Sequence, residues 1–254
     1  MLRATLITTV CLSAMAVPAL AAGPTTVASS STPWVSGDID AAGGGVWSSG
    51  YGAGAFSADA RAALPVTGMV RFEAELRDRG LTESGESVNS FAGVAHLYAQ
   101  NSSYAFGIFG GAGSFDYVTN WTAGGEAQAY FAKLTLDGAV AFQSFNISNV
   151  TGWSARLGGH YYVTPNNRLS LTGLYYSFSG GNLTGAEAAF EHRFTNTPWS
   201  AFAKATWLTE SGYSETAVLG GIRISLDNPG STLQSHDKAV PWESTQSVDT
   251  LFLD

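Results

Sequence analysis

The chain has 254 residues, of which 30 are glycine, and only 13% of its residues are charged. Its formal net charge of −8 argues against nucleic acid as a partner and against a polybasic membrane-surface protein. The length suits one large all-β domain and does not require a second. Beyond the first residues, no stretch is apolar enough to span a membrane as a helix.

The N-terminus has the layout of a secretory signal peptide. Arg3 precedes an apolar run over 4–16, and Pro18 leads to a small-residue site at 19–21, which predicts cleavage before Ala22. A short membrane anchor is the alternative, but the run falls below the ~20 residues that a spanning helix needs.

The predicted signal peptide, 1–21, also contains the chain's single cysteine, Cys11. We therefore expect a mature chain that is held together by neither disulfides nor thiolate metal sites. Residues 22–33 are small and polar, and we expect them to form a loose lead-in.

From residue 34 to residue 226 apolar and polar side chains alternate in successive segments. Because neighbouring strand residues point to opposite faces, such segments predict strands with one apolar and one polar face. The clearest is 70–77, where Val70 and Phe72 face away from Arg71 and Glu73. In chain order, the predicted strands cover 35–41, 54–64, 70–77, 90–99, 104–111, 125–131, 134–143, 153–161, 168–175, 184–194, 201–207 and 214–226.

The connections alternate in length. Short turns are predicted at 65–68, 101–103, 164–167 and 195–198, and longer polar loops at 78–88, 112–123 and 146–151. Long strands with short turns at one end are typical of transmembrane β-barrels, whose tilted strands need ~9–11 residues. Lipid offers no hydrogen-bond partners, so the sheet has to close without an edge. We predict an all-β, transmembrane, antiparallel up-and-down barrel of about 12 strands, with 10 or 14 as alternatives.

The charged residues predict a polar lumen inside an apolar wall. They fall on the strand face opposite Ala, Gly, Leu, Val and Phe, where a soluble barrel would need apolar core residues. The predicted lumen-lining residues are Asp38, Asp40, Asp59, Arg61, Arg71, Glu73, Glu75, Arg77, Glu126, Asp137, Arg156, His160, Glu187, Glu191, Arg193, Lys204, Glu215 and Arg223.

Opposite charges on neighbouring strands are expected to offset the cost of enclosing them. We expect Asp59 and Arg61 beside Arg71 and Glu73, and, where the barrel closes, Arg223 beside the Asp38–Asp40 pair. Aromatic residues near the predicted strand ends suit interfacial girdles. They are Trp34, Trp47, Trp121, Trp153, Trp199, Trp207 and Tyr213.

The signal peptide, the alternating strands and the closing G-x-x-I-x-L at Gly221, Ile224 and Leu226 resemble bacterial outer-membrane β-barrel proteins. The likeness is to the porin-like barrels common in alpha-class proteobacteria, covers 34–226, and rests on patterns rather than a signature. It implies the Gram-negative cell outer membrane, contact with outer-membrane lipid, and a closing strand that the barrel-assembly machinery reads.

The chain departs from this family after the closing strand. In the family that strand usually ends the chain with an aromatic residue, whereas here it ends at Leu226 and a polar tail, 227–254, follows. We expect the tail to be mostly disordered and periplasmic.

The leading functional hypothesis is a porin-like protein with a narrow charged lumen for small solutes, or a structural envelope protein. A barrel of eight strands is filled by side chains and one of ~16–18 leaves a channel, so about twelve lies between. One alternative is a soluble secreted β-barrel that binds an apolar ligand, with the apolar faces turned inward. Oligomeric state cannot be deduced from the sequence.

A second alternative is an outer-membrane lipid-modifying enzyme, which would depend on His160 or His192. We expect His96 and His160 to face inward, His192 to face outward and His236 to lie in the tail. No G-x-S-x-G elbow occurs, and no Cys or His spacing suits a metal. We therefore predict no catalytic residues, no metal and no cofactor.

Overall fold

The computed structural model describes residues 35–48, 51–83, 86–115, 118–146, 150–210, 212–227 and 230–243. The predicted signal peptide, the predicted lead-in and Trp34 lie outside these ranges.

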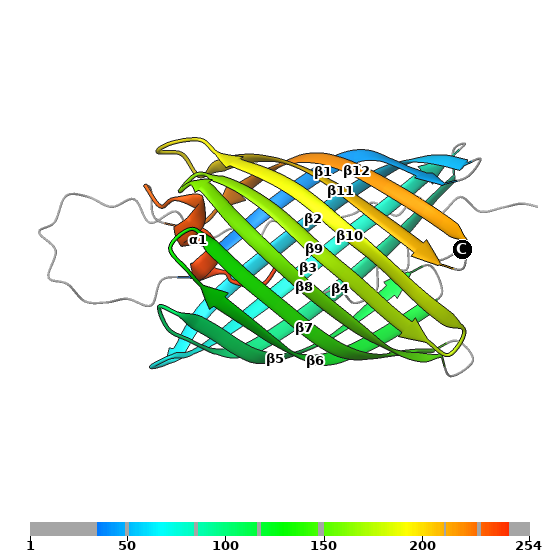
Figure 1. The fold of residues 1–254 in the computed structure, drawn as a ribbon, viewed down its shortest axis with the longest axis horizontal. Helices are drawn as coiled ribbons and strands as arrows, with labels where there is room; N and C mark the ends of the chain where they lie inside the picture. The colour runs from blue at the N-terminus through cyan, green and yellow to red at the C-terminus, as the bar shows by residue number, and fades with distance from the viewer. Residues whose placement is uncertain are drawn as a thin grey trace, which may run out of the picture. The chain divides into compact units, whose positions relative to one another are not determined.

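Twelve strands form one closed barrel (Figure 1). Each strand is antiparallel to its neighbours in the chain, and β12 pairs with β1 to close the sheet. This confirms the predicted up-and-down barrel and its strand number. No helix in the described part of the chain is long and apolar enough to cross a membrane. The strands are β1 (Ser36–Ser48), β2 (Tyr51–Thr67), β3 (Val70–Glu83), β4 (Glu86–Gln100), β5 (Tyr104–Phe115), β6 (Val118–Tyr130), β7 (Leu134–Phe145), β8 (Thr151–Thr164), β9 (Asn167–Phe178), β10 (Gly181–Arg193), β11 (Trp199–Glu210) and β12 (Tyr213–Ser225).

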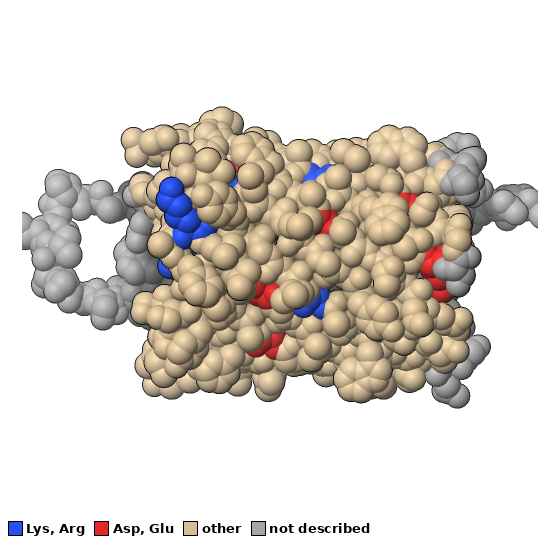
Figure 2. Space-filling model, viewed as in Figure 1, with Lys and Arg blue, Asp and Glu red and all other residues tan. Residues whose placement is uncertain are grey.

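Side-chain alternation gives the barrel an apolar outside and a polar inside. On β3, Leu76 is 54% exposed, whereas Glu73 and Glu75 are 0% and 3% exposed. The outer wall is almost free of charge, which shows only in small patches between the outward side chains and towards the ends (Figure 2). A soluble barrel with an apolar core would have the opposite arrangement, so that alternative is wrong.

Exposed aromatic side chains lie towards both ends of the wall. We call the end that holds Ser36 and Ser225 the terminal end, and the opposite end the distal end. Trp47, Trp121, Trp153, Trp207 and Tyr213 are exposed towards the distal end, and Trp199 towards the terminal end. Between them the wall is aliphatic, as lipid contact requires.

Of the three longer loops predicted, the one at 146–151 is confirmed, because β7 ends at Phe145 and β8 begins at Thr151. The predictions at 78–88 and 112–123 are wrong. Most of 78–88 and 112–123 belongs to strands, and only 84–85 and 116–117 connect β3 to β4 and β5 to β6. Polar and glycine-rich composition indicated loops, but the same residues continue the alternation on a polar inner face. The glycine run 43–45 likewise lies inside a strand, β1, and a Cβ on Gly44 would collide with the Val218 carbonyl oxygen.

The tail contains a short helix, α1 (Leu233–Ala239), which lies at the terminal end of the barrel (Figure 1). Thr232 caps it, because its side chain accepts a hydrogen bond from the Ser235 N–H. Leu233, Val240 and Trp242 are at most 2% exposed. The prediction of a disordered tail is therefore wrong for 230–243, whose few apolar residues are buried against the barrel; residues 244–254 lie outside the described residues.

Candidate functional site: the charged lumen

The structure turns the predicted lumen residues to the inner wall. Asp59, Arg71, Arg156, Glu187 and Lys204 are half-buried there. The buried ones are Asp38, Asp40, Arg61, Glu73, Glu75, Arg77, Glu126, Asp137, His160, Glu191, Arg193, Glu215 and Arg223. Enclosed charges are costly unless paired and hydrogen-bonded, so their partners decide the stability of the lumen.

Asp38 is the centre of the first ion-pair network. Its carboxylate accepts hydrogen bonds from Arg61 Nη2 at 2.7 Å and Nε at 3.1 Å, and lies 2.8 Å from His236 Nε2. Arg223 is 3.9 Å from Asp38 and 3.2 Å from Asp40. The closure of β12 on β1 thus brings Arg223 beside the aspartates, as the sequence predicts.

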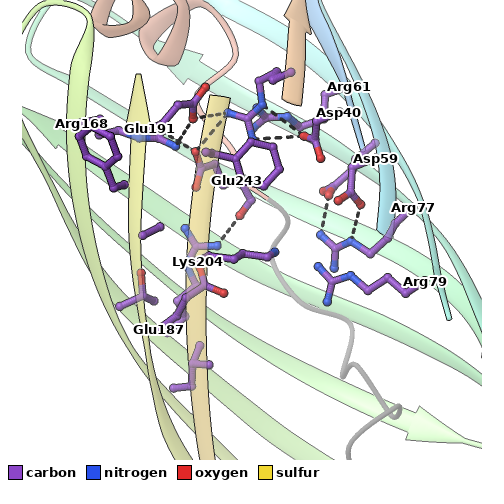
Figure 3. Close-up of a pocket in the computed structure, with 18 residues that line it drawn as sticks. Asp40, Asp59, Arg61, Arg77, Arg79, Arg168, Glu187, Glu191, Lys204 and Glu243 are labelled. Atoms are coloured by element: carbon purple, nitrogen blue, oxygen red, sulfur yellow. Dashed lines mark hydrogen bonds and ion pairs between the residues drawn. The ribbon is translucent and has the colours of Figure 1, made fainter. Parts of the chain in front are cut away.

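Arg77 forms the second network. It donates to Asp59 at 2.9 Å and to Glu75 at 2.7 Å (Figure 3). The expected neighbourhood was wrong here: Asp59 lies opposite Arg77, and Arg61 opposite Glu75, because the tight turn at Gly68 and Met69 sets the β2–β3 register. Arg71 instead donates to Gln100 at 3.3 Å.

Glu191 links three strands. Its Oε2 accepts hydrogen bonds from Arg168 on β9 and from Arg223 on β12, each at 2.9 Å. Arg223 has a further partner in Asp40, so Arg168 is the guanidinium that shares its only wall carboxylate among the described residues.

Asp137 and His160 form a third cluster with Arg156. Arg156 Nη2 donates to Asp137 at 2.6 Å, and His160 Nε2 lies 2.9 Å from the other Asp137 oxygen. The remaining ring nitrogen of His160 is 2.8 Å from Ser170 Oγ. Gly158 leaves space for this carboxylate, since a Cβ there would lie 2.2 Å from Asp137 Oδ2.

The other predicted lumen residues have neutral or single partners. His96 Nδ1 lies 2.9 Å from Glu126, and Arg193 donates to Ser225 at 3.1 Å. Glu187 accepts from Thr206 at 3.1 Å. His192 faces outward, as predicted, with Nδ1 2.8 Å from Asn167 Oδ1.

A cavity of about 90 Å³ lies among these networks (Figure 3). Seven Lys or Arg side chains and six carboxylates line it. The cations are Arg61, Arg77, Arg79, Arg156, Arg168, Lys204 and Arg223, and the carboxylates belong to Asp40, Asp59, Glu75, Glu187, Glu191 and Glu243. A water molecule needs ~10–15 Å³ of such space, so the cavity is large enough for several waters or a small solute.

The tail reaches the cavity from the terminal end. Near the rim, Leu233 donates its N–H to Asn166 Oδ1 at 3.2 Å, and Gln234 donates its N–H to the Pro165 carbonyl at 3.0 Å. Deeper in, Asp237 accepts from Arg168 at 2.9 Å and from Tyr162 at 2.7 Å.

The last described residues of the tail lie in the middle of the lumen. The Trp242 ring stacks on His96 with centroids 6.3 Å apart, and its carbonyl accepts from Arg61 at 2.7 Å. The Glu243 carboxylate lies 2.5 Å from Arg168 and 3.9 Å from Arg223, and Arg156 donates to its backbone carbonyl. We call residues 230–243 the plug segment.

Two groups outside the strands have shifted pKa values. Burial favours neutral His236, but hydrogen bonds to Asp227 and Asp38 outweigh it and raise the pKa of His236 to about 9. Burial likewise opposes the charge on Glu243, yet Arg168 and the neighbouring lumen cations hold its pKa well below the usual range. Both groups are therefore charged near neutral pH, and both hold the plug segment in place.

Sequence reasoning missed Arg79, Arg168 and the charged residues of the plug segment. Arg79 continues the alternation of Arg71 to Arg77, and Arg168 precedes two outward leucines, so a longer reading of the pattern would have placed both inside. Nothing in the sequence near Asp237 and Glu243 indicates a binding partner inside the barrel.

The predicted closing-strand signal lies in β12. Ile224 is opposite Ile39, and the Leu226 N–H donates to the Gly37 carbonyl at 2.7 Å, which completes the seam. Gly221 has no room for a side chain: a Cβ there would lie 2.4 Å from the Ala41 carbonyl oxygen and 2.6 Å from the Phe202 ring. Recognition of this strand by assembly machinery stays a prediction.

No metal-binding group of three or more His, Cys, Asp or Glu occurs among the described residues. No protein-family model and no curated protein matches the chain. Solved structures do. The KdgM porin in complex with disordered oligogalacturonate and the KdgM porin alone each align with a TM-score of 0.53 and 11% identity, over 75% of this chain and 99% of theirs.

The chain has the fold of an outer-membrane porin. The anion-selective porin from Comamonas acidovorans also aligns, with a TM-score of 0.43 and 10% identity over 77% of this chain and 99% of its own. At 11% identity the two KdgM alignments establish the barrel fold, and the chemistry of the lumen depends on this chain's own side chains.

Proposed function

We propose that the protein is a porin-like barrel of the Gram-negative outer membrane that lets small charged solutes pass through its lumen. A cleaved signal peptide exports it, the assembly machinery reads its closing strand, and its outer wall contacts outer-membrane lipid. The terminal end, with the barrel's two chain ends, faces the periplasm, as in barrels of this type. The apolar outer wall with aromatic residues towards both ends supports the location.

The observation that carries the proposal is the cavity of about 90 Å³ in the lumen, with charged side chains on all sides. A barrel that served only as a scaffold could fill its interior with apolar side chains, which avoids the cost of enclosing ions. Charged rings, in contrast, replace part of an ion's hydration and select by sign. Lys204 and Arg79 extend the charged lining towards the distal side, beyond the plug segment.

One feature supports the enzymatic alternative. Ser170, His160 and Asp137 form a hydrogen-bonded row with the connectivity of an acyl-transfer relay. The row faces the lumen and not the lipid, however, and Asp137 is held by Arg156 at the same time. We propose that it is structural and that the protein is not an enzyme. Loss of lipid or ester turnover in Ser170→Ala, with the folded barrel retained, would contradict this.

Two measurements test the proposed function. Fractionation with heat-dependent mobility in SDS tests the location: a membrane barrel is recovered in the outer membrane and migrates faster unheated. Planar-bilayer recordings of the refolded full chain and of a chain ending at Asp227 test passage of ions. If both chains are electrically silent, the channel function is wrong and a structural envelope role is left.

A further inference from the structure

The plug segment is held in the lumen as a ligand would be held. Besides its buried apolar side chains, it has polar contacts to wall residues on several strands: β1 through Asp38, β2 through Arg61, β4 through Gln100 and β9 through Arg168. None of them is a strand pairing. The segment can therefore leave without breaking the closed sheet, and the barrel's register does not depend on it.

Glu243 occupies a cationic site that the wall builds without its help. Arg168 and Arg223 share Glu191, and Arg223 has a second wall partner in Asp40 at 3.2 Å. The Glu243 carboxylate lies 2.5 Å from Arg168 and 3.9 Å from Arg223. The wall alone contributes seven cations and five carboxylates to the cavity, and Glu243 supplies the sixth. Two of these cations, Arg61 and Arg156, are paired with Asp38 at 2.7 Å and with Asp137 at 2.6 Å, which lie outside the cavity lining, so the place that suits a carboxylate ligand is the local one beside Arg168, whose wall partner Glu191 is shared with Arg223.

Glu243 is also the most exposed carboxylate among the ion pairs around the cavity. Its side chain is 29% exposed, compared with 2% for Glu191 and 13% for Asp59. Figure 3 shows it among the cavity residues, beside Arg168 and Glu191.

Some of the buried groups around the docked plug segment oppose its docking. Around Trp242, the Tyr98 hydroxyl and the Trp242 Nε1–H are buried without a protein hydrogen-bond partner. Glu73, which lies opposite His96 on the neighbouring strand, is buried with neither carboxylate oxygen bonded. Enclosing such groups opposes docking, and both the buried apolar side chains and ion pairs such as Glu243–Arg168 offset that cost.

We propose that the plug segment is a self-supplied occupant of a carboxylate-binding site, and that small polycarboxylate solutes compete with Glu243 for Arg168 and Arg223 and thereby open the lumen. This rests on the proposed function, because it names the solute class of the same lumen. It also adds a regulatory step, since the pore is closed by its own chain until a suitable anion arrives.

Displacement can be measured without any current. Leu233 is fully buried, and the predicted mature chain has no cysteine, so a Leu233→Cys variant of the full chain reports departure of the segment by its maleimide labelling rate. We expect citrate to raise that rate several-fold, and sodium chloride of equal ionic strength to leave it unchanged. Equal rates in both salts would overturn the competition.

A second variant tests the carboxylate itself. Adding Glu243→Gln to Leu233→Cys removes the charge that faces Arg168 and should raise labelling about tenfold, the effect of losing one charge-assisted hydrogen bond. Glu215→Gln is the matched control, because it changes the lumen charge equally at the distal end without touching the plug segment. If Glu243→Gln labels no faster than the control, the site assignment is wrong.

Bilayer recordings separate this inference from the proposed function. We expect the chain ending at Asp227 to conduct several-fold more than the full chain and to prefer anions in a salt gradient. Equal conductance in the two chains would leave the porin function standing and remove the plug. Silence in both, together with citrate-dependent labelling, would remove the channel and leave the binding site.

Discussion

The outer and inner faces of the same strands differ in how specific their residues have to be. On β8, Leu157 faces outward with 73% exposure and needs only to be apolar, because lipid makes no directional contacts. Arg156 and His160 on the same strand face inward, and both need the same partner, Asp137, within 2.9 Å. The outer wall therefore depends on composition and the lumen on individual pairs. Substitutions can separate these two dependencies.

We expect the largest loss of unfolding free energy where the lumen loses a carboxylate that two basic residues share. Asp38→Asn leaves Arg61 and His236 enclosed without the carboxylate they share, and breaking a buried pair in this way costs ~3–5 kcal/mol of unfolding free energy. Urea unfolding of the barrel in lipid vesicles, followed by tryptophan fluorescence, measures it. Glu215→Gln is the control: Glu215 has no ion pair among the described residues, and we expect its free energy to change little.

The outer wall is tested by a charge placed at two depths. Leu157→Arg puts a guanidinium in the middle of β8, where lipid contact costs ~2–4 kcal/mol of unfolding free energy. Val163→Arg, at the terminal end of the same outward face, should cost ~0–1 kcal/mol because the charge reaches the interface. Equal losses in the two variants would mean that this face does not contact lipid.

The same contrast explains what the sequence could predict. Period-two alternation with apolar outward residues, such as Leu76 and Leu97, is a property of single strands, so the barrel, its strand number and its inward faces follow from it. Register depends on where a turn falls. The tight turn at Gly68 places Asp59 opposite Arg77, not beside Arg71, and no single-strand pattern contains that information.

The plug segment could not be predicted either, and the physical reason is a different one. A short polar stretch with Leu233, Val240 and Trp242 cannot bury enough surface by itself to fold, and it was interpreted as disordered on that ground. Its stability comes from a surface built by residues more than a hundred positions away, such as Gln100 and Arg61. Partners this far away in the chain leave no pattern in the sequence of the plug segment itself.

A smaller effect is expected from a single methyl group inside the lumen. Gly158→Ala would place Cβ 2.2 Å from Asp137 Oδ2 and push that carboxylate away from His160, at a cost of ~1–3 kcal/mol of unfolding free energy. Gly159→Ala is the adjacent control on the outer face, where the nearest atom is Leu136 Cδ2 at 3.6 Å. A loss of similar size in both variants would show that the cost does not come from the Asp137–His160 pairing.

The last prediction concerns docking of the plug segment, and not unfolding, as pH changes the charge of His236. Docking raises the pKa of His236 to about 9, above the ~6.5 of a free histidine, so the docked segment binds the proton more tightly. That stabilisation is complete below pH ~6.5 and is lost as the pH rises through about 9, when the neutral ring faces Asp38 and Asp227. Labelling of Leu233→Cys, corrected for thiol ionisation with an exposed-cysteine standard, should therefore accelerate over this range. His236→Gln should label faster at neutral pH and lose the dependence, whereas an unchanged pH profile in that variant would assign the effect to another group.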